Sequence, residues 1–228
     1  MSLLAIKLNS FIQLTGAEHA CLSELQRAPF RLRRGEELVH EGQTGHIVYI
    51  VQDGWLCSFK LLADGGRQII TFPLPGDCVG LRSVLLRTSD HSFSALTDAV
   101  VCGVDAAEIL RIFHEFPRLG TAILWGASRD EAMVVEHLVN IGRRSPLERT
   151  AHFFLELGDR LRLVGLATDD EFHCPLDQYV LGDALGLTAI HVNRVLRELR
   201  EHKLLTLKTK TVRIHDACGL KRLAGVPE

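Results

Sequence analysis

Polar side chains near the C-terminus have the types and spacing needed to contact nucleic acid. The residues expected on the outward face of one helix are His191, Asn193, Arg194 and Arg197. Arginine and asparagine can hydrogen-bond to base edges, and cationic side chains pair with phosphates. An ordinary solvent-exposed face more often mixes glutamate with lysine. We interpret this quartet as a DNA-binding surface, with an ordinary helical hairpin as the alternative.

Two short helices joined at a glycine are predicted to position the quartet. Asp177 can cap the first helix, Gly186 supplies the tight turn, and Thr188 can cap the second helix. The apolar residues expected on the two inner faces are Val180, Leu181, Ala184, Leu185, Val192, Val195, Leu196 and Leu199. This arrangement is typical of a helix-turn-helix, whose second helix enters a major groove.

A two-stranded wing and a local positive charge are predicted beside these helices. Residues 204–214 alternate on both sides of a polar turn, with Lys208 and Lys210 near the tip. The net charge of −2 argues by itself against a nucleic-acid binder. However, residues 189–213 contain seven basic side chains and two acidic ones. A phosphate backbone requires such a local excess, although most charge runs are simply solvated helix faces.

Other kinds of chemistry lack the residues they need. The chain has no His-x-His pair for a cupin-like metal site and no Gly-x-Ser-x-Gly motif. The cysteines stand singly, without a Cys-x-x-Cys pair: Cys21, Cys57, Cys78, Cys102, Cys174 and Cys218. We therefore expect no enzyme, no cofactor and no metal site. The rival hypothesis is a cupin-like metal-dependent enzyme.

Two minor alternatives stay open. Cys174 lies just before the predicted helix-turn-helix and could act as a redox switch, although a buried small side chain is the more common role. A histidine could hold haem, although a lone histidine is usually structural. The candidate haem ligands are His40, His46, His91 and His114.

The N-terminal half predicts a small antiparallel barrel or roll. β-prone stretches at 47–51, 55–62 and 68–72 are separated by regularly spaced glycines, and Asp64-Gly65-Gly66 predicts a hairpin. From about Ala106 the pattern becomes helical.

A long helix is expected after Pro117. Its apolar stripe is either a wall of its own domain's core or a seam against a second subunit, and we favour the seam. The stripe comprises Leu119, Ile123, Leu124, Met133, Val134, Leu138 and Ile141. Ser145-Pro146-Leu147-Glu148 then predicts a capped helix start, followed near 169–171 by an acidic loop. The expected divisions are 1–116, 117–144 and 145–228.

Over almost its whole length the chain resembles the Crp/Fnr family of regulators, and most of all its FixK-like branch. The resemblance rests on Arg34-Gly35-Glu36, Glu41-Gly42, Gly54, Pro75-Gly76-Asp77-Cys78-Val79-Gly80, Val139–Ser145, Leu185-Gly186-Leu187-Thr188 and His191-Val192-Asn193-Arg194. It implies an α+β fold with an N-terminal antiparallel β-roll like that of cyclic-nucleotide-binding domains, a long dimerisation helix and a C-terminal winged helix-turn-helix.

The resemblance also implies roles for residues at the DNA surface. Arg194 takes the position that reads a guanine, Thr188 the position that caps the helix and contacts phosphate, and Asn193 a base-contacting position. Ile190 stands where the family has a glutamate, so the usual contact to cytosine is in doubt. The expected DNA-binding residues are Thr188, His191, Asn193, Arg194, Arg197, Lys208 and Lys210.

The sensor half departs from the pattern of members that bind cyclic AMP. Leu81 replaces the glutamate that holds the ribose, and His91-Ser92 replaces the Arg-Ser pair that holds the phosphate. A buried cyclic phosphate would lack a charge-assisted hydrogen bond, so we predict that cyclic AMP does not bind in the usual manner. Arg82 or Arg87 could substitute. The expected effector pocket comprises Gly80, Leu81, Arg82, His91 and Ser92.

The sequence also predicts the location of the protein and its partners. The chain has neither a secretory signal nor an apolar run that could span a membrane, so we expect a cytoplasmic bacterial protein. We expect a homodimer that binds a palindromic operator in double-stranded DNA. Activation and contact with RNA polymerase are implied by the family resemblance alone.

Overall fold

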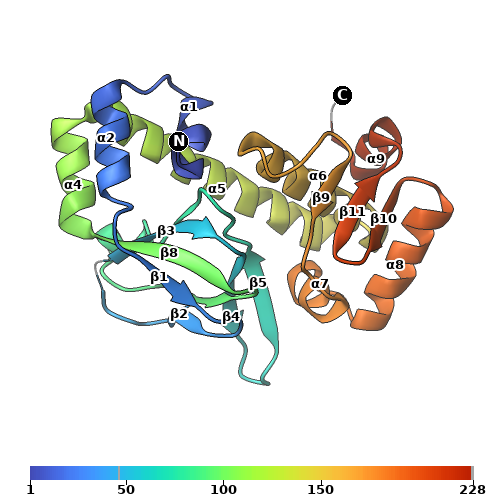
Figure 1. Ribbon diagram of the computed structural model, residues 1–228. Helices are drawn as coiled ribbons and strands as arrows, with labels where there is room; N and C mark the ends of the chain where they lie inside the picture. Colours follow the sequence, from blue (N-terminus) through green and yellow to red (C-terminus); the bar gives the residue numbers. More distant parts are fainter. Residues whose placement is uncertain (46, 227–228) are drawn as a thin grey trace. The chain divides into compact units, whose positions relative to one another are not determined.

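The protein is described by a computed structural model that covers residues 1–45 and 47–226. His46, considered above as a haem ligand, lies outside the described residues. Contacts divide the chain into a first unit, Met1–Leu61 with Ile70–Met133, and a second unit, Leu62–Ile69 with Val134–Glu228. Figure 1 gives the order of the elements along the chain.

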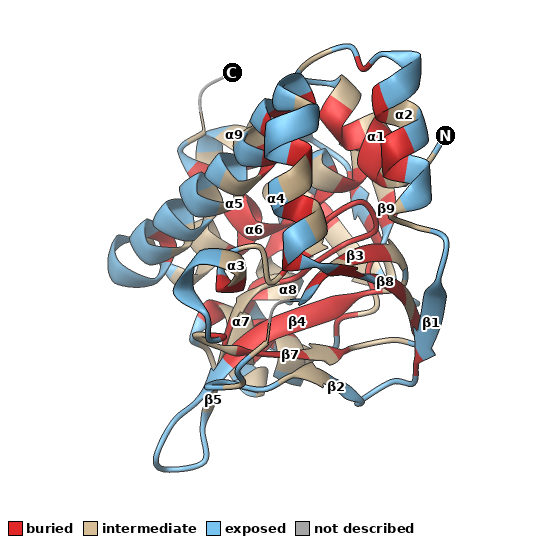
Figure 2. Cartoon of the chain, turned by 90° about the vertical axis from the view of Figure 1, so that its left-hand side faces the viewer, coloured by how far each residue is buried: buried red, intermediate tan, exposed pale blue. Residues whose placement is uncertain are grey.

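Antiparallel sheets form the roll expected from the regularly spaced glycines. One sheet has the order β1 (Pro29–Leu32), β8 (Ala99–Asp105), β3 (Ile47–Asp53) and β6 (Cys78–Val79). The other has the order β2 (Glu37–Val39), β7 (Ser92–Ala95), β4 (Leu56–Leu61) and β5 (Arg67–Thr71). The strands predicted at 47–51, 55–62 and 68–72 are β3, β4 and β5. Most of β4 is buried (Figure 2).

The predicted hairpin between β4 and β5 is present. Gly65 has φ +84°, a left-handed conformation that glycine adopts without a steric penalty. The Leu62 N–H donates to the Gly66 carbonyl at 2.8 Å, and the Gly66 N–H donates to Asp64 Oδ1 at 2.9 Å. These bonds close the turn at the Asp64-Gly65-Gly66 segment.

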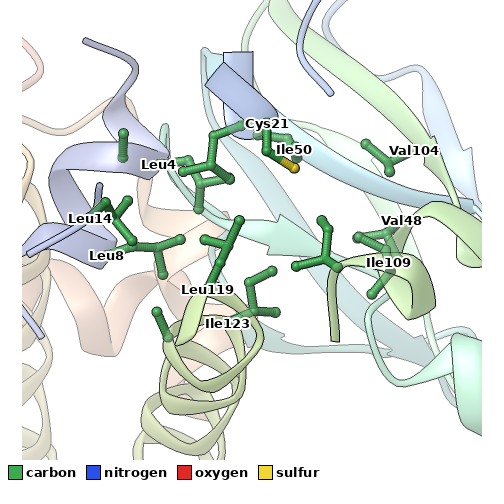
Figure 3. Close-up of a cluster of buried hydrophobic side chains, with 14 of the residues drawn as sticks. Leu4, Leu8, Leu14, Cys21, Val48, Ile50, Val104, Ile109, Leu119 and Ile123 are labelled. Carbon is green, nitrogen blue, oxygen red and sulfur yellow. The ribbon is translucent and has the colours of Figure 1, made fainter. Parts of the chain in front are cut away.

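Helices cover one side of the roll and complete its core. Two short helices that the sequence patterns do not predict, α1 (Leu3–Asn9) and α2 (Gly16–Glu24), pack with β3, β8 and α4 (Ala106–Glu115). Figure 3 shows Leu4 and Leu8 of α1 facing Leu119 and Ile123 of the long helix α5 (Pro117–Arg143). A further short helix, α3 (Ser83–Leu86), follows β6.

The long helix α5 (Pro117–Arg143) begins at the proline, as predicted, but its apolar stripe divides into two parts. Leu119 and Ile123 are buried at 0% and 6% exposure in the core of the first unit. Leu138, in the second unit, is 72% exposed. The seam expectation is therefore wrong for Leu119 and Ile123, which form a wall of their own unit's core.

The second unit begins with the capped helix predicted from Ser145-Pro146-Leu147-Glu148. In α6 (Pro146–Leu163), Ser145 Oγ accepts the Glu148 N–H at 3.3 Å, and the Ser145 N–H donates to Glu148 Oε2 at 2.7 Å. The helices α7 (Gln178–Leu185), α8 (Ala189–Glu201) and α9 (Ala217–Ala224) follow. The structure thus has the expected α+β architecture, with a roll, a long helix and a winged helix-turn-helix.

A small sheet completes this unit in the order β10 (Leu205–Lys208), β11 (Thr211–Ile214) and β9 (Glu171–His173). The expected acidic loop at 169–171 is corrected at its last residue, because Glu171 begins β9 and pairs with Arg213 of β11. In the described part of the chain, none of the helices combines the length and apolarity that crossing a bilayer requires.

Candidate nucleic-acid interface

Local hydrogen bonds define both helices of the predicted helix-turn-helix. Asp177 Oδ1 accepts the backbone N–H groups of Tyr179 at 2.9 Å and Val180 at 3.0 Å at the start of α7. Thr188 Oγ1 accepts the N–H of His191 at 3.2 Å at the start of α8. Both caps satisfy backbone donors that a helix N-terminus leaves unpaired. The predicted capping roles of Asp177 and Thr188 are confirmed.

The turn between the helices depends on two glycines, of which the sequence analysis identified one. Gly186 ends α7 with φ +63° and ψ +42°. Gly182 was missed: a Cβ atom there would lie 2.6 Å from the Leu187 carbonyl oxygen. The Gly182 carbonyl accepts the Leu187 N–H at 3.0 Å. The turn therefore packs directly against the backbone of α7.

A side chain from α6 secures the end of α7. Arg149 Nη1 donates to the Leu185 carbonyl at 2.9 Å. This carbonyl belongs to the last turn of α7, where acceptors lack intrahelical partners. The sequence offered no local indication of this contact because the two residues are 36 positions apart.

The inner and outer faces of α8 differ sharply in burial. Val192, Val195 and Leu199 are 0–3% exposed and pack inside the unit. Asn193, Arg194 and Arg197 are exposed on the other face. His191 is half-buried, and its Nε2 atom contacts Arg194 Nη2. The structure thus brings the predicted quartet together on α8. Both arginines are exposed to solvent, and Arg197 Nε also lies 3.8 Å from Glu201 Oε1.

The wing is a two-residue hairpin with lysines at its tip. Leu205 pairs with Ile214 and Lys208 with Thr211, while Thr209 and Lys210 have φ +52° and +60°. Positive φ at both central residues is typical of turns that match the strand twist. Lys208 and Lys210 are exposed, as a phosphate-binding role requires.

Arg213, counted in the positive segment, is paired with an acidic residue from outside that segment. Arg213 Nη2 lies 2.5 Å from Glu171 Oε2, and Arg213 Nε donates to the same oxygen at 2.9 Å. Hydrogen bonding to Glu171 raises the pKa of Arg213. The positive footprint expected over 189–213 is therefore smaller than the sequence count suggested, because Glu171 neutralises one of its charges.

The expected effector pocket contains a network that the sequence analysis missed. Asp90 Oδ2 pairs with Arg82 Nη2 at 3.0 Å, and Asp90 Oδ1 pairs with His91 Nδ1 at 2.8 Å. Burial lowers the pKa of His91, against the opposing effect of Asp90. His91 is therefore mostly neutral at pH 7 and supplies little positive charge.

The remaining pocket residues have structural contacts. Leu81 packs against the core of the first unit, and Ser92 Oγ accepts the Glu41 N–H at 2.9 Å. Gly80 has φ +81°, with the Ile47 carbonyl 3.2 Å from the position of a Cβ atom. Arg82, His91 and Ser92 thus lie close together through Asp90 and sequence adjacency, whereas Leu81 belongs to the core.

Two domain families match the two halves of the chain. Residues 29–116 match the family described as cyclic nucleotide-binding domain, and residues 148–223 match the Crp-like helix-turn-helix domain. The nitrogen fixation regulation protein FixK of Bradyrhizobium diazoefficiens is 33% identical over 195 residues, which cover 83% of this chain and 79% of that protein. The transcriptional activatory protein AadR of Rhodopseudomonas palustris is 32% identical over 217 residues, covering 93% and 87%.

The chain belongs to the Crp/Fnr family. Its fold agrees with this assignment: FixK2 from Bradyrhizobium japonicum superposes with a TM-score of 0.79 at 28% identity, covering 88% of this chain and 98% of that one. This Crp/Fnr protein is a transcriptional regulator with a helix-turn-helix DNA-binding domain, rather than an enzyme.

The cysteines of this regulator carry no disulfide in the described part of the chain, where groups of three or more metal-ligating side chains are also absent. Cys174 is fully buried, and burial raises the pKa of its thiol to about 12. A thiol is reactive as the thiolate, so Cys174 is a poor nucleophile at neutral pH. The structure favours the packing role over the redox role for this residue.

Proposed function

We propose that this regulator acts as a homodimer that binds an inverted repeat in duplex DNA, with α8 of each subunit in a major groove. The observation that carries the proposal is the outward face of α8, where Asn193, Arg194 and Arg197 are exposed beside a buried apolar face. Twofold symmetry would place half-site centres about 10 base pairs apart, or a multiple of that distance.

Each exposed group has a chemistry suited to one part of the duplex. Arg194 can donate two hydrogen bonds to guanine O6 and N7, and Asn193 can hydrogen-bond a second base. Thr188, Arg197, Lys208 and Lys210 are suited to phosphates, which position the protein without reading sequence. His191 orients Arg194 through their contact and can meet a phosphate.

The dimer proposal rests on the second part of α5. Within the second unit, this helix exposes Val135 at 54%, Leu138 at 72% and Ile141 at 42%. These residues recur at intervals of three and therefore lie on neighbouring parts of one helix face. Such an apolar face is suited to pack against the same helix of a second copy.

The promoter output we propose is activation, through contact with RNA polymerase in the bacterial cytoplasm. Support comes from the named relatives, several of which are transcriptional activators. We further propose that the effector is a molecule other than cyclic AMP, or that none is needed. This follows from the neutral His91 and from Arg82, which Asp90 already pairs.

Selection of bound sequences from random duplex DNA tests the proposed function. We expect an enriched inverted repeat, and we expect Arg194→Ala to weaken binding to it by about 10- to 100-fold and to relax the preference at one base pair. Arg194→Lys keeps the charge but not the planar fork, so it should retain general DNA affinity and lose the guanine preference.

Arg27→Ala is a matched control, because Arg27 is an exposed arginine of the first unit whose Nη1 pairs with Glu24 Oε1 at 2.8 Å. It should leave affinity and base preference unchanged. Unchanged affinity and unchanged base preference in Arg194→Ala would refute the assignment of α8 as the reading helix. Failure to enrich any sequence would refute sequence-specific binding itself.

A further inference from the structure

Ile190 has an exposure that the fold does not explain. It is the second residue of α8, and its side chain is 84% exposed, the highest value among the large hydrophobic residues that the structure describes. Full burial of an isoleucine contributes roughly 1.5–3 kcal/mol to stability, and this residue gains almost none of it. A β-branched side chain also adds little to helix stability.

The position of Ile190 places it with the DNA-facing residues rather than with the core. Asn193, Arg194 and Arg197 follow it by three, four and seven residues, so all four share one face of α8. The buried side chains Val192, Val195 and Leu199 lie on the other face. Ile190 is therefore an apolar group at the start of an otherwise polar reading surface.

The chemistry of the side chain limits what it can recognise in a major groove. Isoleucine can neither donate nor accept a hydrogen bond, so it cannot read the polar edges of guanine, cytosine or adenine. The C5-methyl group of thymine is the apolar feature of a base edge there. Contact between the two would remove apolar surface of both from water, including the surface that α8 leaves exposed.

We propose that Ile190 is a specificity-determining residue that contacts the methyl group of a thymine in each half-site. Residues one helical turn apart have Cβ atoms about 5–6 Å apart, and base pairs rise about 3.4 Å. The thymine is therefore one or two base pairs from the guanine read by Arg194. This inference rests on the proposed function, since it requires α8 to lie in the major groove.

Replacing thymine by deoxyuridine removes the methyl group and keeps base pairing, so it tests the contact directly. Starting from the selected inverted repeat, each thymine is replaced in turn in both half-sites, and the affinities of wild type and Ile190→Ala are measured. We expect one position at which deoxyuridine weakens the wild type by about four- to tenfold per half-site. At that position the affinity of Ile190→Ala should be the same for the thymine and the deoxyuridine duplex, because the two changes remove the same contact.

Two further variants sharpen the test. Ile190→Glu should shift the preference at that position away from thymine, because a carboxylate can accept a hydrogen bond from cytosine N4. Leu85→Ala is the matched control: Leu85 is 80% exposed but lies in the first unit, so its loss should leave the deoxyuridine penalty unchanged. The thermal stability of Ile190→Ala should match the wild type, since the side chain is exposed.

The possible outcomes separate this inference from the proposed function. If the repeat is bound but every deoxyuridine duplex binds as tightly as its thymine parent, the methyl contact is refuted and the proposed function stands. The same holds if the penalty persists undiminished in Ile190→Ala. If no duplex sequence is preferred at all, the proposed function fails, and the inference fails with it.

Discussion

At the scale of single residues, the effector pocket illustrates how a partner changes what a side chain can do. Arg82 and His91 look from the sequence like candidates to hold a phosphate. In the structure both pair with Asp90, and burial lowers the pKa of His91. A cyclic phosphate would meet a carboxylate, an already paired arginine and a neutral imidazole. None of these offsets the cost of burying its charge.

We therefore predict that cyclic AMP gives no saturable binding heat in isothermal titration calorimetry, even at millimolar concentration, near pH 7. Asp90→Asn provides a comparison, because it removes the carboxylate that pairs with Arg82. Any weak affinity for cyclic AMP should increase in this variant. Micromolar affinity of the wild type, lost in His91→Ala, would contradict the prediction.

At the scale of elements, a polar relay connects the end of α5 to α6. Arg144 Nη1 donates to Asn140 Oδ1 at 2.6 Å, which leaves the Asn140 amide NH₂ to donate to His152 Nδ1 at 3.1 Å. His152 Nδ1 must therefore be an acceptor, so the ring is neutral. Its Nε2 lies 3.5 Å from Glu136, which also pairs with Arg144.

The relay predicts a loss of stability in mild acid. Burial, and to a smaller extent Arg144, lowers the pKa of His152 below the ordinary 6.5, despite opposing effects of Glu136 and Glu156. In mild acid the unfolded chain therefore binds more protons than the folded one. The contribution of neutral His152 to the free energy of unfolding is fully present above about pH 6.5 and is lost as the pH decreases below it. We expect the melting temperature to fall between pH 7.5 and pH 5.5.

His152→Gln is the control for this prediction, because glutamine does not titrate. The variant should be less stable at pH 7.5, but its melting temperature should change less with pH than that of the wild type. The neighbouring pair His137–Glu156, at 2.6 Å, is present in both proteins, so the pH dependence of that pair itself is common to them. Equal pH dependence in the two proteins would show that His152 does not control the effect.

At the scale of the whole molecule, self-association should depend on the exposed side of α5. Leu138→Glu would place an unpaired charge in the proposed helix–helix contact, so we expect the dimer dissociation constant to rise by about a hundredfold or more. Sedimentation velocity measures this change. Binding to the inverted repeat should weaken in parallel, because a monomer reaches one half-site at a time.

Because Leu138 is 72% exposed in the single chain, its replacement should leave the circular dichroism spectrum of the subunit unchanged. Leu85→Glu changes a similarly exposed leucine in the first unit and should remain dimeric. A Leu138→Glu protein that sediments as a dimer would place the contact between subunits elsewhere.

The features that the sequence alone determined are those set by neighbours within a few residues. The caps at Ser145, Asp177 and Thr188, the start of α5 at Pro117 and the turn at Gly186 all appear where the local pattern predicted them. Their hydrogen bonds and dihedral angles involve residues no more than four positions apart, so the local pattern is sufficient information.

Only the tertiary structure decided which surfaces are covered and which charges are paired. The division of α5, the Arg149 contact to α7, the pairing of Arg213 with Glu171 and the close approach at Gly182 were not predicted. Arg213 and Glu171 are 42 positions apart, and Leu119 is buried in a core cluster that also contains side chains of α1 and β3. Such contacts depend on how distant segments meet, and an amphipathic pattern on one helix does not state which partner will cover it.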